Sequence, residues 1–428
     1  MWGSAARPSV RTLENVRAIG SNRKIDRNML RSFLLALLVL SPGVLLAANV
    51  ERASPGDVHV VVRTSPSWDK WTSAKDPETR GWLQSNIWRM MVFSPYFDGK
   101  VSWYRGAWVY VDLYAVYAEG QIAREHPDWI LKDPNGNRLY IPWGCHDGAC
   151  PQYAGDISNA DFRSWWIANA RKLQGIGYRG FWIDDVNMEF RVGDGQGKQV
   201  APLDRNTGKP MTYTSWKRYV AEFTEQIRKA FPSMEILHNV IWFASAPQRE
   251  ADPYVRRELA AADYINLERG TSDGGLTGGS GPFALGRFLE YIDHIHDLGR
   301  GVILDNGGKT DEYALASYFL ISSGRDGVGL PHYSPAEPFP GAHVDLGDPS
   351  GPRESWNGML RRVYSKGVVL INPPGSPRRR VQSASFLRRA DGMKAAPINL
   401  GPAEGVVLSG ESTSGTALNS AIKILPAN

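Results

Sequence analysis

The sequence has few cysteines, no long unbroken apolar run, no internal repeat and no low-complexity tract. Its two cysteines and their neighbours supply too few ligands for a structural zinc site. The apolar block Phe33 to Leu40 is broken by Ser41-Pro42-Gly43, whereas a membrane-spanning helix needs about 20 apolar residues in a row. A chain of 428 residues with 42% hydrophobic and 22% charged residues is instead typical of a globular protein with one large and one small domain.

An excess of charge is also missing from most of the chain. The 49 basic and 44 acidic residues give a net charge of +5, but residues 1–31 contain seven of the basic and two of the acidic ones. Subtracting these leaves 42 basic and 42 acidic residues after position 31. The folded part therefore lacks the basic surface of a nucleic-acid-binding protein, and we expect no nucleic-acid partner.

The basic N-terminal segment leads into the apolar block and then into VLLAA at 44–48. A positive flank, a short apolar stretch and small residues at its end are typical of a secretory signal. We expect residues 1–48 to be an N-terminal extension and signal peptide, with Met29 as a more plausible start than Met1. The chain would then be exported to the periplasm or secreted. Because Leu46 stands where a small residue is preferred, an uncleaved segment anchored in the inner membrane is the alternative.

Cys145 and Cys150 lie close together in the Gly-rich polar stretch GCHDGACPQ. In an exported chain this spacing favours a small loop closed by a disulfide. Free thiols are one alternative. A metal site is the other, and it would have to be built from one tight loop.

Short apolar runs alternate with longer amphipathic stretches between residues 55 and 350, which is typical of βα units around a parallel sheet. Two of these stretches, 161–173 and 214–231, carry apolar residues at helical spacing. Eight strands close a barrel, so we predict an α/β chain with a (β/α)8 TIM barrel as its catalytic domain at 55–350. The predicted strands are 58–64, 89–96, 107–114, 179–186, 234–242, 262–270, 301–308 and 326–333.

After about residue 355 the pattern changes to β-branched runs interrupted by Gly and Pro, without helical spacing. We predict a small C-terminal antiparallel β domain at 355–428, β-sandwich-like and packed on the barrel. A structural role is the favoured interpretation of this domain.

Acidic residues stand at the ends of several predicted strands, where a barrel of this type has its active site. Asp184 and Asp185 end the fourth strand, Glu268 the sixth and Asp305 the seventh, and Asp112 lies in the third. Buried carboxylates are costly unless they are paired or hydrogen-bonded, so their presence at the ends of apolar strands is informative. Converging carboxylates with aromatic neighbours are what glycosidic bond cleavage requires.

Other polar and aromatic residues near these strand ends are candidates for binding a sugar. Each acidic residue also has a structural interpretation: Asp184, Asp185 and Asp305 could cap the following helices, and Glu268 could pair with a neighbouring cation such as Arg269. The substrate-binding candidates are Asp112, Tyr114, Trp143, His238, Asn239, Trp242, Asn306 and Tyr333.

A family resemblance supports this interpretation. AREHPDWILKDPNGNRLY and AGDISNADFRSWWIANARKLQGIGYRGFWIDDVNM resemble glycoside hydrolases of the hypothetical glycosyl hydrolase families, which are predicted TIM barrels; the likeness runs from about residue 58 to 410. GFWIDDV is also similar to the strand-four motif of the alpha-amylase superfamily, and this similarity implies that Asp184 is the nucleophile. The match is partial, because the amylase motif has an arginine where this chain has Trp182.

The expected activity is therefore hydrolysis of glycosidic bonds in an extracellular or cell-surface polysaccharide or oligosaccharide, with retention of configuration favoured. Asp184 is the expected nucleophile or base and Glu268 the expected acid, with Asp185 and Asp305 as second choices. No cofactor and no metal ligand set are expected. The alternatives are a non-catalytic carbohydrate-binding barrel and a metal-dependent hydrolase of the polysaccharide deacetylase type, for which the scattered histidines supply no convincing ligand spacing.

Overall fold

A computed structural model describes residues 54–146, 148, 150–242, 251–273, 275–305, 310–394, 397–410, 418 and 421–425. The predicted extension and signal at 1–48 lie outside these residues, and so does Asn306. Within the described part, no helix is long and apolar enough to cross a membrane.

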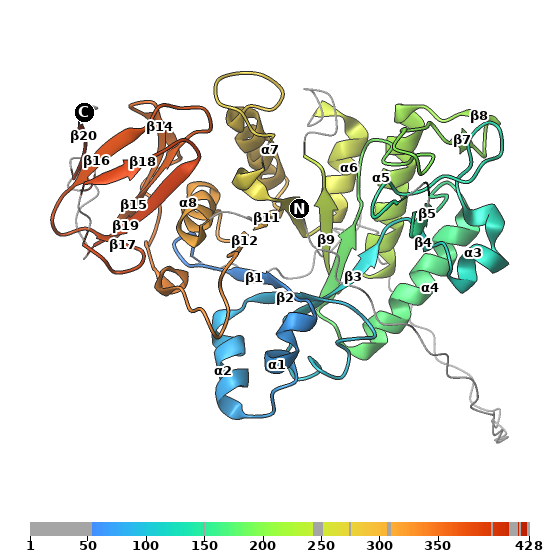
Figure 1. The fold of residues 1–428 in the computed structure, drawn as a ribbon, viewed down its shortest axis with the longest axis horizontal. Coiled ribbons are helices and arrows are strands. Elements are labelled where there is room, and N and C mark those ends of the chain that lie inside the picture. The colour runs from blue at the N-terminus through green and yellow to red at the C-terminus, as the bar shows by residue number, and fades with distance from the viewer. Residues whose placement is uncertain are drawn as a thin grey trace, which may run out of the picture. The chain divides into compact units, whose positions relative to one another are not determined.

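Eight parallel strands form a closed barrel, which confirms the predicted fold class (Figure 1). Their order around the barrel is β1-β12-β11-β10-β9-β6-β3-β2. Each observed strand lies within one of the predicted runs. The strands are β1 (Val60–Arg63), β2 (Arg89–Val92), β3 (Ala107–Asp112), β6 (Gly180–Asp184), β9 (Glu235–Val240), β10 (Tyr264–Glu268), β11 (Gly301–Asp305) and β12 (Gly327–Gly329).

The helices that cover the barrel begin and end at residues suited to those positions. In α4, Asn159 accepts the backbone N–H of Asp161, and Gly177 ends the helix with a φ of 103° that favours glycine. In α5, the side chain of Thr212 accepts the backbone N–H of Ser215. The helices are α1 (Asp69–Thr72), α2 (Pro77–Asn86), α3 (Gln121–Glu125), α4 (Ala160–Ile176), α5 (Tyr213–Ala230), α6 (Pro253–Ala261), α7 (Leu285–Asp297) and α8 (Asp311–Ile321).

The inside of the barrel is filled by large side chains. Trp108, Trp182 and Tyr264 cluster with aliphatic residues from the other strands. Below them, toward the N-terminal ends of the strands, the buried Glu235 accepts two hydrogen bonds from Arg89, at 2.8 and 2.9 Å. It also accepts one from the Trp108 indole at 2.7 Å and one from Arg179 at 3.0 Å. We call these residues and this ion pair the barrel floor. A substrate site at the C-terminal ends of the strands must therefore lie above the barrel floor.

The long connections after β3 and β6 carry short strands of their own. β4 (Ala115–Tyr117) pairs with β5 (Gln152–Ala154), and β7 (Leu203–Asp204) pairs with β8 (Lys209–Pro210). Both connections begin at the C-terminal end of the barrel, so they build up the surface around its mouth.

The C-terminal region forms two antiparallel sheets that face each other across an apolar core of their own. On its other side, the larger sheet packs on α8, which is buried almost along its whole length. The Tyr364 hydroxyl donates to the Phe319 carbonyl of α8 at 2.6 Å, and the two sheets lie beyond α8 in Figure 1. The strands are β13 (Glu354–Trp356), β14 (Met359–Tyr364), β15 (Gly367–Asn372), β19 (Glu404–Ser409) and β17 (Arg388–Arg389) in one sheet, and β18 (Ile398–Leu400), β16 (Arg379–Ser383) and β20 (Ile422–Leu425) in the other.

Candidate active site

Polar side chains form a layer directly above the apolar filling of the barrel. Side chains alternate between the two faces of a strand, so residues two positions beyond the filling point inward as well. Asp184 follows Trp182 in this way, and Asp305 follows Ile303. Adjacent strands align Asp112 with Asp184 and Glu268 with Asp305. The structure therefore brings the predicted carboxylates to the same end of the barrel.

The Asp184 carboxylate is held by three hydrogen bonds. Oδ2 accepts the Tyr110 hydroxyl at 2.8 Å, and Oδ1 accepts the Asn239 side-chain amide at 2.7 Å and the backbone N–H of Asp185 at 2.8 Å. The Asn239 amide is itself oriented, because its oxygen accepts the side-chain amide of the fully buried Asn266 at 2.7 Å. Asp184 thus has one fixed orientation, maintained by residues on three neighbouring strands.

Asp185 lies beside Asp184 in an unusual backbone conformation. Its φ of 55° is in the left-handed region, and its side chain is buried. Oδ1 accepts the Asn187 amide at 2.9 Å and lies 3.4 Å from an Arg191 nitrogen. Burial, and then the negative charge of Asp184, raise its pKa to about 7, although Arg191 and Asn187 oppose the shift. Asp185 therefore retains its proton close to neutral pH.

The residue after Glu268 has the same kind of strain. Arg269 has a φ of 66°, so the backbone enters the left-handed region directly after Asp184 on one side and directly after Glu268 on the other. Such conformations cost about 1–3 kcal/mol for a residue that is not glycine, and they cluster at functional sites.

Asp112 lies beside Asp184 on the neighbouring strand and is half-buried. Its Oδ1 accepts the backbone N–H groups of Tyr114 and Ala115 at 2.9 and 2.7 Å. Burial and the nearby charges of Asp185 and Asp184 nevertheless raise its pKa well above the ordinary value. The folded state therefore favours the protonated form of Asp112.

Arg63, at the end of β1, faces the other wall of the site. One of its guanidinium nitrogens lies 2.9 Å from Asp305 and 3.6 Å from Glu268. Burial alone would lower the pKa of Arg63, but Asp305, and after it Glu268 and Asp184, raise it above the ordinary value. The arginine therefore stays charged and offsets two of the carboxylates.

A cavity of about 190 Å³ opens between these walls. Asp184, Asp185 and Glu268 line this cavity. Asp305 does not, and its carboxylate accepts a hydrogen bond from Arg63. The complete lining is Asp184, Asp185, Asn187, Arg191, Asn239, Val240, Ile241, Trp242, Glu268, Arg269 and Asp273.

Among the predicted sugar-binding residues, Asn239 and Trp242 line the cavity. His238 does not lie in the site, because it is on the opposite face of β9 from Asn239 and contacts Glu258 of α6 at 2.6 Å. Tyr114 is buried under the loop after β6, where its hydroxyl donates to the Arg191 carbonyl at 3.5 Å. Tyr333 is also buried, and its hydroxyl donates to Asn86 of α2 at 2.8 Å.

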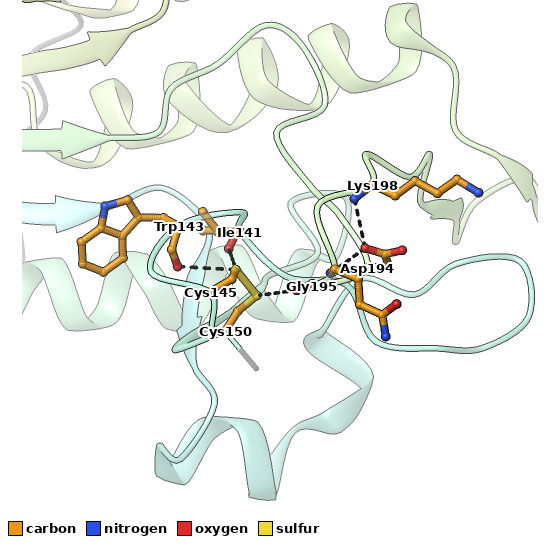
Figure 2. The surroundings of a disulfide bond; sticks show 8 residues. Ile141, Trp143, Cys145, Cys150, Asp194, Gly195 and Lys198 are labelled. Carbon is orange, nitrogen blue, oxygen red and sulfur yellow. Dashed lines mark hydrogen bonds between the residues drawn. A yellow bond between two sulfur atoms is a disulfide. The ribbon is translucent and has the colours of Figure 1, made fainter. Parts of the chain in front are cut away.

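Trp143 lies outside the cavity, next to the pair of cysteines. Cys145 and Cys150 form a disulfide, and the Trp143 indole extends away from it (Figure 2). The sulfur of Cys150 lies 3.9 Å from the carbonyl oxygen of Gly195, in the loop after β6. The disulfide loop therefore contacts the loop that supplies Asn187 and Arg191 to the cavity.

Several residues that hold the site together were not among the predicted ones. Tyr110 and Asn266 could have been found from strand alternation, because each lies two positions before a predicted carboxylate on the same strand. Arg63 is the last residue but one of the first predicted strand, 58–64, and was visible as a charge near its end. Arg191 comes from an irregular loop, for which the sequence holds no signal.

In the described part of the chain, no group of three or more His, Cys, Asp or Glu residues could hold a metal ion. No family model and no curated protein matches the sequence.

The chain is similar to several solved glycoside hydrolases, at low identity and low TM-score. The glycoside hydrolase domain of PelA from Pseudomonas aeruginosa is 13% identical, with 64% of this chain and 94% of that chain covered and a TM-score of 0.35. The trehalose-6-phosphate hydrolase of Bacillus licheniformis is 9% identical, with 82% of this chain and 99% of that chain covered and a TM-score of 0.45. The isomalto-dextranase of Arthrobacter globiformis T6 is 12% identical, with 86% of this chain and 76% of that chain covered and a TM-score of 0.44. Likenesses this low leave the reaction of this chain to be inferred from its own site.

Proposed function

We propose that this protein is a glycoside hydrolase that cleaves glycosidic bonds of a polysaccharide. The observation that carries the proposal is the cavity at the C-terminal mouth of the barrel, where Asp184 and Asp185 face Glu268 across β9. A glycosidase needs two carboxyl groups on opposite sides of the scissile bond, one to attack or activate water and one to protonate the leaving oxygen. The carboxyl groups that line this cavity from β6 and β10 support the proposal.

Asp184 is the proposed nucleophile, and retention of configuration is the favoured outcome. Both of its oxygens are held by donors from Tyr110, Asn239 and the backbone of Asp185, which aim the carboxylate into the cavity. A carboxylate held in one orientation is suited to attack a sugar carbon, because catalysis depends on a near-attack geometry.

Glu268 is the proposed general acid. Its side chain is 46% exposed at the mouth of the barrel, where a leaving sugar would have access to it. Asp185 is the rival for this role, because its raised pKa keeps it protonated up to about pH 7. Asp305 is a weaker candidate than either, since its carboxylate is paired with Arg63 and does not line the cavity.

The experiment measures reducing-end release from soluble dextran, xylan, laminarin, polygalacturonate and chitosan, and hydrolysis of 4-nitrophenyl glycosides. Asp184→Asn should lower turnover by several orders of magnitude, because the amide keeps the shape but cannot attack. Glu268→Gln should lower turnover on polysaccharide by about 10²–10⁴-fold and spare the nitrophenyl glycosides, whose leaving group needs little protonation.

Asp128→Asn is the control, because Asp128 is an exposed aspartate that does not line the cavity, and it should leave turnover at the wild-type value. If Asp184→Asn remains active on a polysaccharide that the wild type cleaves, the proposed mechanism is wrong. If Asp185→Asn and not Glu268→Gln shows the leaving-group dependence, Asp185 is the acid. Polysaccharide binding that survives in all variants, with no turnover by the wild type, would instead indicate a carbohydrate-binding barrel.

We also propose that the chain is exported, on the basis of the basic and apolar residues that precede position 48. Residues 29–60 fused to a reporter that is active only outside the cytoplasm should give signal, with the mature N-terminus near Ala48. Retention of the fusion in the cytoplasm would contradict export.

A further inference from the structure

The exposed aromatic side chains of the barrel domain are unevenly distributed. In the described part of the domain, Tyr117, Trp143, Tyr213 and Phe283 are the exposed aromatics, and Trp143 has the largest exposed fraction at 54%. All four belong to connections that leave the C-terminal ends of β3, β6 or β10. The exposed large side chain at the opposite end, Ile176, is aliphatic. Exposed rings therefore gather at the end of the barrel that holds the cavity.

Trp143 lies two residues before a covalently closed turn. Its backbone N–H donates to the Ile141 carbonyl at 2.8 Å, and the disulfide closes the chain just beyond it. Antiparallel pairing anchors the base of the turn, where Ile141 donates to the Gln152 carbonyl at 3.1 Å. Figure 2 shows the indole extending away from this base. The loop therefore presents a flat ring that its own neighbours do not bury.

The same loop is connected to the catalytic cavity. Tyr140 and Gly193 exchange two backbone hydrogen bonds of 2.9 Å, and Gly193 is two residues from Arg191, which lines the cavity. From these links, the Cα atoms of Trp143 and Arg191 are at most about 25 Å apart. A polysaccharide chain of a few sugars can span that distance.

We propose that the disulfide-closed loop and the adjoining Trp143 form a glycan-binding subsite outside the catalytic cavity, with Trp143 stacking on the apolar face of another sugar of the bound chain. The proposal rests on the proposed function and specifies its substrate: a polymer, bound along the mouth of the barrel, rather than a short glycoside. An exposed indole suits this role, because a large rigid ring offers apolar area at a low cost in conformational entropy.

The test compares Trp143→Ala with Phe386→Ala, which removes an exposed ring from the C-terminal domain, 42% exposed in the wild type. Trp143→Ala should lower kcat/KM by about tenfold on the polysaccharide that the wild type cleaves and leave 4-nitrophenyl glycosides unchanged. Trp143→Tyr should recover most of the loss, because tyrosine can also stack. Phe386→Ala should leave both activities at the wild-type value.

Binding gives a second, independent measurement. Affinity electrophoresis in gels containing each of the five polysaccharides should show retardation of the wild type that Trp143→Ala reduces. The double variant Cys145→Ser/Cys150→Ser should reduce it too, because the loop loses its closure. Equal retardation and equal polymer turnover for Trp143→Ala and the wild type would overturn the subsite. That outcome would leave the proposed function intact, since only Asp184→Asn and Glu268→Gln test the latter.

Discussion

Asp185→Asn should remove a loss of unfolding free energy that the wild-type protein shows as the pH rises. Asp185 is 8% exposed, and its pKa in the folded protein is raised from 3.8 to about 7. A raised carboxyl pKa means that the folded state favours the protonated form. The stability that this proton contributes is fully present below pH 3.8 and is lost as the pH rises through about 7. Asparagine keeps the shape and the acceptor for Asn187, but it does not titrate.

The expected size follows from the shift. One pKa unit corresponds to 1.36 kcal/mol, so between pH 5 and pH 8.5 the wild type should lose about 3 kcal/mol of unfolding free energy relative to Asp185→Asn. The charge of Asp185 is among the causes that raise the pKa of Asp112, so the pKa of Asp112 should fall in the variant. This fall also makes the variant lose less unfolding free energy than the wild type as the pH rises. The measurement is urea unfolding followed by tryptophan fluorescence at both pH values.

Asp128→Asn is the control, since Asp128 is an exposed aspartate on the surface. Its difference from the wild type should be the same at pH 5 and pH 8.5. A pH-independent difference for Asp185→Asn as well would refute the reasoning, because it would mean that Asp185 is ionised in the folded protein throughout this range.

Two further changes test the layers above and below the aromatic filling of the barrel. Arg89→Met should lower the free energy of unfolding by about 1.5–3 kcal/mol in urea titrations, because it removes the bidentate partner of the buried Glu235 and leaves Arg179, at 3.0 Å, as its remaining cation; a loss below about 1 kcal/mol would contradict this. Asn266→Leu should lower kcat on the cleaved polysaccharide and leave KM nearly unchanged, because Asn239 loses the donor that orients it toward Asp184. An unchanged kcat would show that Asn239 is positioned by other contacts.

The fold could be predicted because barrel strands are buried on both faces and therefore read as short continuous apolar runs. VHVVVRT and RGFWIDDV are examples, and the structure has β1 and β6 inside them. The same reasoning located Asp184, Glu268 and Asp305, because a charged residue that ends an apolar strand has few positions other than the rim.

Individual side chains in the site were harder to assign. A position at the rim of the barrel does not tell whether the side chain points into the barrel or toward the surrounding helices. His238 and Asn239 are neighbours at the end of β9, yet only Asn239 points inward, since alternate residues face opposite sides. Arg191 reaches Asp185 from a loop whose path depends on tertiary contacts with the disulfide region. Such contacts join residues that are distant in sequence, and one sequence contains no record of them.

The barrel floor has a consequence for protein engineering. Because Trp108, Trp182 and Tyr264 pack over the Arg89–Glu235 pair, the elements that close the barrel are separate in space from those that line its mouth. Connections after β3, β6 and β10 therefore do not contribute to the barrel floor, but those after β3 and β6 bury side chains such as Trp129 and Phe190 in the main core. A library that varies only the exposed residues of these connections would sample new specificities on an unchanged scaffold.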